Sequence, residues 1–399
     1  MAVSDSPRDG RRIATMLAAI VCVAIVAEGA ARAGRPWIDR AFRDYFRAVE
    51  RWPYGERNVS FDRARFKDLY LHPPRGERPL VLLGDSLCQS YGVDDDHSLA
   101  GQLRDRLAEL GARGVRVHGM AEDGSGLVSQ MQTMLALSAR LPPTHFVLYL
   151  NPLAAGDAGP PGDVDDPWAR LRRDGNSAEV RAFYLLSRGG IASWNPDVLE
   201  TAIGLLLEPR VALLGYSDKI RYIVTRLRAR RNLDRGLDLR DVNPLFRGRL
   251  SPDGTLAFVR KNEANLWTNR LALVRDLELS RRFARDNVPL LRTAGREAAR
   301  LGHRFSVAVA PTFLDAIAEN EDERRTYARN KAALLAALRE GGLTVLETPE
   351  IDGAENYYDH HHMLPPGLAR VARALAPEIA AWIASAPDGG TGARSVRSD

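Results

Sequence analysis

The sequence predicts an α/β fold in which helices cover a central parallel sheet, and three observations lead to this fold class. From Pro79 onward, short apolar runs alternate with amphipathic stretches, which is the pattern of βαβ units. One of these runs leads directly into a tight turn that carries a serine, as happens at the carboxyl edge of such a sheet. The 399 residues, 45% of them hydrophobic, suffice for a sizeable core.

The expected elements follow in order along the chain. Strands are predicted at 79–83, 115–118 and 146–150, with helices at 99–110 and 127–139 between them. The alternation then stops, and the segment from 153 to about 281 predicts a mostly helical insertion that begins with a loop rich in Gly, Pro and Asp. The alternation resumes with strands at 305–310 and 343–347 and helices at 290–301, 324–339 and 366–384. Pro366 suits the first turn of the last helix.

Four segments make up the domain organisation that we expect. They are an N-terminal anchor or signal segment at 1–34, a connector at 35–78, the α/β domain with its insertion at 79–385, and a disordered tail at 386–399. Inside the insertion, an apolar patch at 202–216 predicts burial in a helical subdomain, with an amphipathic element resting on a membrane as the alternative.

The N-terminus carries the features of an export segment. Arginines at 8, 11 and 12 precede a mainly apolar run from Ile13 to Ala27, which predicts that the N-terminus stays in the cytoplasm and the rest lies outside. The run is short for a spanning helix of about 20 residues, although the small residues at 29–31 can extend it. We favour an uncleaved single-pass anchor. A signal cleaved at 31–33 and a buried helix are the alternatives.

The net charge of +5 comes from arginines on helix-like stretches such as 226–240. Solvated helix faces account for it, with contact to anionic lipid or polymer as the alternative. No stripe of aromatic and basic residues is present, so we expect no nucleic-acid partner. The cysteines, Cys22 and Cys88, are too few for a disulfide framework and indicate no redox compartment.

The segment 81–87 carries the first chemically informative motif, Gly84-Asp85-Ser86-Leu87, directly after an apolar strand. A serine at the carboxyl end of a parallel strand is exposed in the crevice where α/β sheets bind ligands. The backbone amides that follow it can face a developing oxyanion. Ser86 is therefore a candidate nucleophile.

The second motif lies near the other end of the chain, where Asp359 and His362 precede the last helix. A spacing of three residues can place both side chains on one face within hydrogen-bonding reach. The carboxylate then fixes the imidazole tautomer, and the far ring nitrogen takes the proton of a serine hydroxyl. The sequence thus predicts a triad of Ser86, His362 and Asp359.

Metal binding is the alternative for the three histidines at 360–362 with Asp359 as a fourth ligand. We consider it the weaker hypothesis, because adjacent residues project in different directions and no second cluster at a metal-site spacing is found. The run from Asp94 to His97 is interpreted as a solvated turn before a helix rather than a cation site. We expect neither a metal nor a cofactor.

The order and context of these motifs resemble the SGNH (GDSL-type) hydrolase superfamily, in which Gly-Asp-Ser-Leu opens the domain and Asp-x-x-His closes it. Gly367, five residues past the histidine, fits the same pattern. The resemblance covers about residues 79–151 and 284–385. It implies a three-layer α/β/α sandwich of the flavodoxin-like kind.

The resemblance also implies an oxyanion hole made of the Ser86 amide, a glycine after the second strand and an asparagine after the third. Gly124 fits the glycine best, with Gly126 as the weaker choice, and Asn151 fits the asparagine. The chain departs from the family pattern at two positions here. Tyr149 stands where the family has a glycine, and Pro152 replaces an aspartate.

The function implied by the resemblance is acyl transfer through a Ser86 acyl-enzyme. Outside the cytoplasm, the expected substrate is an ester such as an acetylated polysaccharide or cell-wall glycan. We rank a serine esterase or O-deacylase first and an O-acyltransferase of exported polysaccharide second. A non-catalytic protein that keeps the fold for binding or assembly is the third hypothesis. Protein partners and oligomeric state are not predicted.

Overall fold

The computed structural model describes the part of the chain that holds the sheet, its covering helices and the N-terminal helix. The described residues are 15–34, 37, 66, 69–71, 73–74, 77–90, 97–112, 114–121, 125–152, 166–173, 180, 182, 184, 274, 279–357 and 361–385. The chain divides into two compact units, and the second, Glu50–Val198 with Arg247–Asp399, contains the sheet. Most of the connector, the apolar patch at 202–216, the basic stretch at 226–240 and the tail lie outside the described residues.

Five strands form one sheet in the order β2-β1-β3-β4-β5, and every pair is parallel. The strands are β1 Arg78–Gly84, β2 Val115–Ala121, β3 His145–Leu150, β4 Arg304–Val309 and β5 Thr344–Leu346. The central strands are buried on both faces, and every residue of β3 is buried. Continuous apolar strands of this kind are typical of parallel sheets, because helices cover both of their faces. The predicted α/β class is confirmed.

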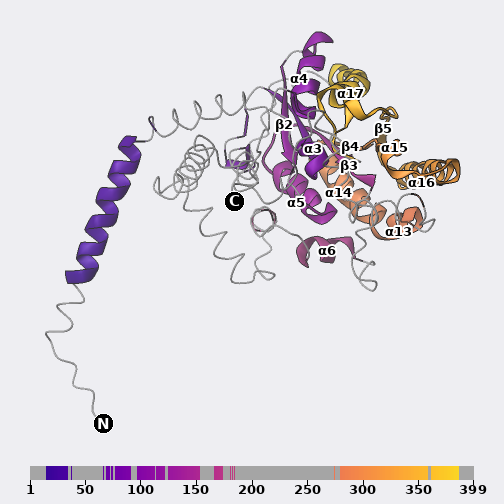
Figure 1. Cartoon of the computed structure of the whole chain (residues 1–399). Helices are drawn as coiled ribbons and strands as arrows, with labels where there is room; N and C mark the ends of the chain where they lie inside the picture. Colours follow the sequence, from indigo (N-terminus) through magenta and orange to yellow (C-terminus); the bar gives the residue numbers. More distant parts are fainter. Residues whose placement is uncertain are drawn as a thin grey trace. The chain divides into compact units, whose positions relative to one another are not determined.

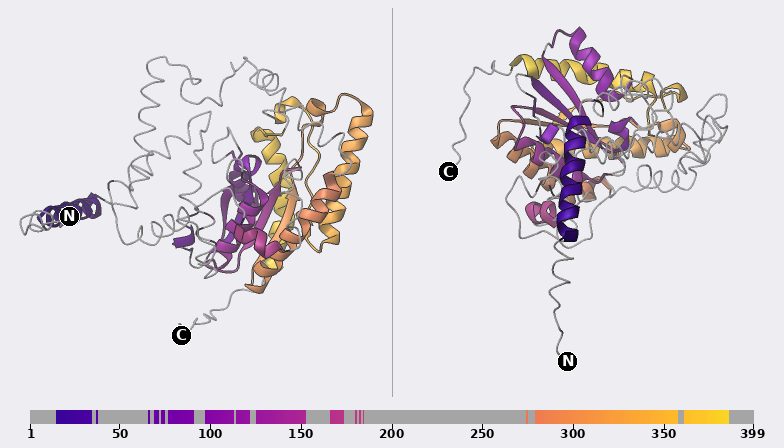
Figure 2. Two further views of the ribbon diagram at one scale, coloured as in Figure 1. Left: turned by 90° about the horizontal axis from the view of Figure 1, so that it is seen from below. Right: turned by 90° about the vertical axis from the view of Figure 1, so that its left-hand side faces the viewer.

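The helices form two layers, one on each face of the sheet (Figures 1 and 2). α4 Leu99–Glu109 packs against α17 Pro365–Ser385, and both share a core with alternate β1 residues such as Leu80 and Leu82. On the other face α5 Leu127–Ser138 packs against α14 Val288–Arg300. α13 Leu279–Asp286, α6 Pro167–Arg173 and α16 Glu321–Glu340 extend this second layer. The arrangement is the expected three-layer α/β/α sandwich.

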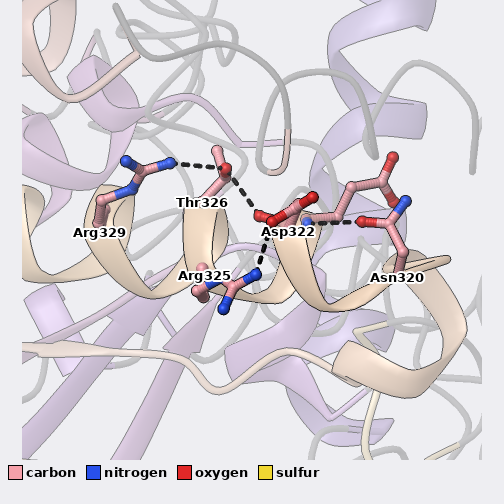
Figure 3. A network of polar contacts seen from close by, with 6 residues as sticks. Asn320, Asp322, Arg325, Thr326 and Arg329 are labelled. Carbon is pink, nitrogen blue, oxygen red and sulfur yellow. Dashed lines mark hydrogen bonds and ion pairs between the residues drawn. The ribbon is translucent and has the colours of Figure 1, made fainter.

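Every strand and helix that was predicted with stated bounds is present, and no end differs by more than three residues. Most of the helical insertion predicted at 153–281 lies outside the described residues. β2 continues to Ala121, three residues beyond the predicted end. α16 begins at Glu321, three residues early, because the side chain of Asn320 caps it by accepting a hydrogen bond of 3.0 Å from Glu323 N. Figure 3 shows this first turn, in which Asp322 also pairs with Arg325 at 2.7 Å. Carboxylates suit this position, because the helix dipole is positive at its N-terminus.

The N-terminal helix spans Thr15–Gly34, 20 residues, and an 18-residue window within it has a mean hydropathy of 1.9. Its apolar side chains, Val26 among them, are exposed, and Glu28 pairs with Arg32 at 2.7 Å near the C-terminal end. The helix is long and apolar enough to cross a membrane, a property that signal sequences share. It is therefore a candidate anchor or signal segment, and its orientation stays a prediction.

Candidate active site

The strand order reverses next to β1, which lies between β2 and β3. In open α/β sheets the chain leaves the carboxyl ends of the strands in opposite directions at this point, so a crevice forms there. Ser86 follows β1 after a single residue, Asp85, and Asn151 directly follows β3. The topology therefore brings these two predicted site residues to the same edge of the sheet.

The turn that carries Ser86 depends on a close approach between backbone and side chains. α3 Ser86–Gln89 starts with no connecting loop after β1, and Asp85 is its N-cap. A Cβ atom on Gly84 would lie 2.4 Å from the Cβ of Cys88 and 2.9 Å from the carbonyl oxygen of Tyr149. Only glycine fits at this position, so the Gly-Asp-Ser order follows from how tightly the helix folds back onto the strand.

α3 ends after a single turn at Ser90, which adopts the left-handed conformation with φ 57. Such a conformation is costly for a residue with a side chain and requires support from its surroundings. The buried Ser90 hydroxyl provides some of it by accepting a hydrogen bond of 2.9 Å from Leu99 N, at the start of α4. The short helix that carries Ser86 is thus fixed at both ends.

His362 lies in a loop whose ends are joined. Tyr357 and Met363 form an antiparallel bridge, and Leu364 N donates to the carbonyl oxygen of Asn356 at 2.9 Å. The N-terminus of α17 fits closely against this loop, because a Cβ on Gly367 would lie 2.6 Å from the Asn356 carbonyl oxygen. The backbone on the C-terminal side of His362 is therefore held in place by α17.

The two ends of the domain meet at Ser86 and His362. The Nε2 atom of His362 and the Oγ atom of Ser86 are 2.9 Å apart, although the residues are 276 positions apart in the sequence. Both side chains are partly exposed, and the His361 ring packs against the His362 ring with 4.2 Å between centroids. A histidine in this position can accept the serine proton. Asp359 lies outside the described residues.

Asn151 is held at the strand end next to Ser86 by Asp85, which joins two strand ends. The Asn151 side-chain amide donates to Asp85 Oδ2 at 2.8 Å, and Asp85 Oδ1 accepts from Leu87 N at 3.0 Å. Asp85 is 8% exposed, so both bonds form in a weakly solvated setting where charged hydrogen bonds are strong. A primary amide has two N–H bonds, and the contact with Asp85 uses one of them.

Gly124, the glycine of the predicted oxyanion hole, lies outside the described residues. The next residue, Ser125, donates from Oγ to the carbonyl oxygen of Gly84 at 3.1 Å. Gly126, the weaker candidate, is the N-cap of α5. The C-terminal end of this loop therefore contacts the strand end that precedes Ser86.

The two departures from the family pattern lie in the interior. Tyr149 is 2% exposed and belongs to the core beneath α4 and α17, and burial raises the pKa of its phenol well above the ordinary value. Pro152 is also buried. Tyr149 thus fills the core of the domain.

Sequence reasoning missed the positions that orient the predicted residues. It gave no role to Asp85, although an acidic residue just before a helix is a recognisable N-cap signal. It also gave none to Ser125 or to Gln130 on α5, which bonds to it. Nothing in an apolar helix distinguishes such a glutamine from any other polar residue.

Within the described part of the chain, no group of three or more His, Cys, Asp and Glu side chains is arranged to hold a metal ion. Asp94–Asp96 and His360 lie outside that part, so the two metal hypotheses stay untested.

No protein-family model, curated protein or solved structure matches this chain. The fold and the geometry around Ser86 are therefore the observations on which a function is inferred.

Proposed function

We propose that the chain is a serine esterase or O-deacylase, with Ser86 as nucleophile, His362 as general base and acid, and Asp359 as the residue that orients the imidazole. One observation carries the proposal, the 2.9 Å contact between Ser86 Oγ and His362 Nε2. It supports the proposal because two short motifs from opposite ends of the domain meet at the point where α/β sheets bind ligands. A serine hydroxyl becomes a useful nucleophile only next to such a base.

The reaction proceeds in two halves. Ser86 Oγ attacks the ester carbonyl carbon while its proton moves to His362 Nε2, and the leaving alcohol then takes this proton as the C–O bond breaks. A water molecule attacks the acyl-enzyme in the second half and gives one proton to His362. The same proton returns to Ser86 when the carboxylic acid leaves. Asp359 stabilises the imidazolium formed in both halves.

The negative charge of each tetrahedral intermediate falls on the former carbonyl oxygen, which needs hydrogen-bond donors. The proposed donors are the Ser86 amide, the Gly124 amide and the Asn151 side chain. Loss of one such donor typically lowers turnover by about 10²- to 10³-fold. The Asp85–Asn151 bond supports this assignment, because a donor that is already oriented needs no reorganisation during the reaction.

The proposed substrate is an extracytoplasmic ester, such as an acetylated polysaccharide or cell-wall glycan. The candidate anchor helix Thr15–Gly34 supports this location, since it would hold the domain at a membrane surface. An acyltransferase would use the same acyl-enzyme and replace water by a sugar hydroxyl. The replaced glycine and aspartate beside Asn151, at Tyr149 and Pro152, are the reason for a second candidate, a non-catalytic binding protein of the same fold.

Product analysis separates these candidates. The full chain in detergent is given p-nitrophenyl acetate with and without a sugar acceptor, beside the Ser86→Ala and His362→Ala variants. Free acetate from the wild type alone supports an esterase, and acetylated sugar supports a transferase. A folded wild-type chain that releases p-nitrophenol no faster than both variants would contradict the proposal and favour the binding protein.

A further inference from the structure

Two buried side chains fasten the connection between β2 and α5 to the turn that carries Ser86. Ser125 is 8% exposed, and its hydroxyl donates to the carbonyl oxygen of Gly84 at 3.1 Å. Gln130 is 6% exposed and reaches back from the first turns of α5. Its Nε2 atom lies 2.9 Å from the Ser125 carbonyl oxygen and 3.3 Å from the Ser125 hydroxyl oxygen. We call the pair Ser125 and Gln130 the loop clamp.

The loop clamp contacts the strand end that leads to one proposed oxyanion donor, the Ser86 amide. Gly84 is the last residue of β1, and the peptide group that accepts the Ser125 hydrogen bond leads into Asp85 and then Ser86. A change in the position of Ser125 therefore moves the Gly84 peptide group and, through Asp85, the Ser86 amide.

We infer that the loop clamp is a positioning device for the oxyanion hole, in which Gln130 holds Ser125 and Ser125 holds the turn that presents the Ser86 amide. This inference rests on the proposed esterase function and adds two residues to it. Neither residue touches the substrate. A misplacement of about 1 Å in a catalytic group can lower the rate by about 10²-fold, so an indirect role of this kind has a large kinetic effect.

Helix α5, which carries Gln130, also provides a matched control for the loss of a buried glutamine. Gln132 is 0% exposed, and its Nε2 atom donates to the carbonyl oxygen of Leu171 at 2.7 Å. Leu171 belongs to α6, in the second helical layer, and not to the connection next to Ser86. Gln130→Leu and Gln132→Leu thus remove the same kind of hydrogen bond from the same helix. Each removes an amide hydrogen bond to a backbone carbonyl and is expected to lower the stability.

The test compares the two variants in the full chain, with p-nitrophenyl acetate as the ester and thermal unfolding as the measure of stability. We expect both variants to lose stability and only Gln130→Leu to lose turnover. Its kcat should fall about 10- to 100-fold with KM within about 3-fold, because the affected donor acts in the transition state. Ser125→Thr keeps the hydroxyl and should restore most of the turnover that Ser125→Ala loses.

A double substitution tests whether the two residues act through one another. Ser125→Ala with Gln130→Leu should lower kcat no further than the more damaging single change, since both break one chain of contacts. Should Gln130→Leu fail to fold, Ser125→Ala removes only the Ser125 hydroxyl and must show the same split between kcat and KM. Equal kcat for the Gln130 and Gln132 variants would overturn the inference while leaving the esterase intact. A wild-type chain without esterase activity would overturn both.

Discussion

Replacement of His145 by glutamine should remove much of the acid sensitivity of the domain. His145 opens β3 and is 2% exposed, and burial together with the cation of Arg304 lowers its pKa to about 3 from an ordinary value near 6.5. Its Nε2 atom lies 2.8 Å from Ser306 Oγ, and its ring meets the Trp382 ring edge-on at 4.4 Å. This setting accommodates the neutral ring and not the imidazolium.

The direction in which stability changes with pH follows from proton binding. Between pH 6.5 and about 3 the unfolded chain binds a proton at His145 that the folded chain does not, so stability falls as the pH is lowered through this window. At pH 5 the unfolded imidazole is mostly protonated, which costs the folded state about 2 kcal/mol relative to pH 7.5. His303, whose pKa burial also lowers, adds to the effect with the same sign.

The assay is urea unfolding of the full chain at pH 7.5 and pH 5. Glutamine keeps a polar contact with Ser306 and cannot titrate, so the stability deficit of His145→Gln should shrink by about 2 kcal/mol between the two pH values. His97→Gln, at an exposed position, controls for the loss of an imidazole as such. The reasoning is refuted if the deficit of His145→Gln is the same at both pH values.

Three further substitutions test single contacts. Asn151→Ala should lower kcat about 10²- to 10³-fold with little change in KM in ester hydrolysis, and an unchanged kcat would remove Asn151 from the oxyanion hole. Gly367→Ala should displace the His362 loop, since the new Cβ would lie 2.6 Å from the Asn356 carbonyl oxygen. A variant with the kcat and the melting temperature of the wild type would contradict this. Tyr149→Phe should be neutral or stabilising by up to about 3 kcal/mol in urea unfolding, because the described residues offer the buried hydroxyl no hydrogen-bond partner, and a clear destabilisation would disprove it.

Much of the fold could be predicted because its strands are buried on both faces. β1, β3 and β4 appear in the sequence as short apolar runs, and amphipathic helices separate them. The end of β2 was predicted too early, because Gly119 interrupts the apolar pattern, although Met120 and Ala121 after it are buried. The start of α16 was missed because its acidic first turn, from Glu321 to Glu323, has no apolar periodicity.

The candidate site, too, could be predicted from the sequence only in part. Ser86 and His362 could be proposed from local motifs, since a strand-to-turn serine and a closely spaced acid and histidine carry their own chemical signal. Their contact was expected from the predicted triad, but its geometry could not be derived, because it depends on how α17 packs against the loop near Asn356. The Asp85–Asn151 bond likewise depends on two strands that are neighbours in the sheet and distant in the sequence.

The central claim is that Ser86 is an activated nucleophile, and covalent labelling tests it most directly. The full chain in detergent is treated with a fluorophosphonate, and its intact mass is compared with that of the Ser86→Ala and His362→Ala variants. The account predicts one adduct on the wild-type chain and none on either variant, because Ser86 needs the base at 2.9 Å to react. A folded wild-type chain that stays unlabelled, or a His362→Ala chain labelled as fast as the wild type, would contradict it.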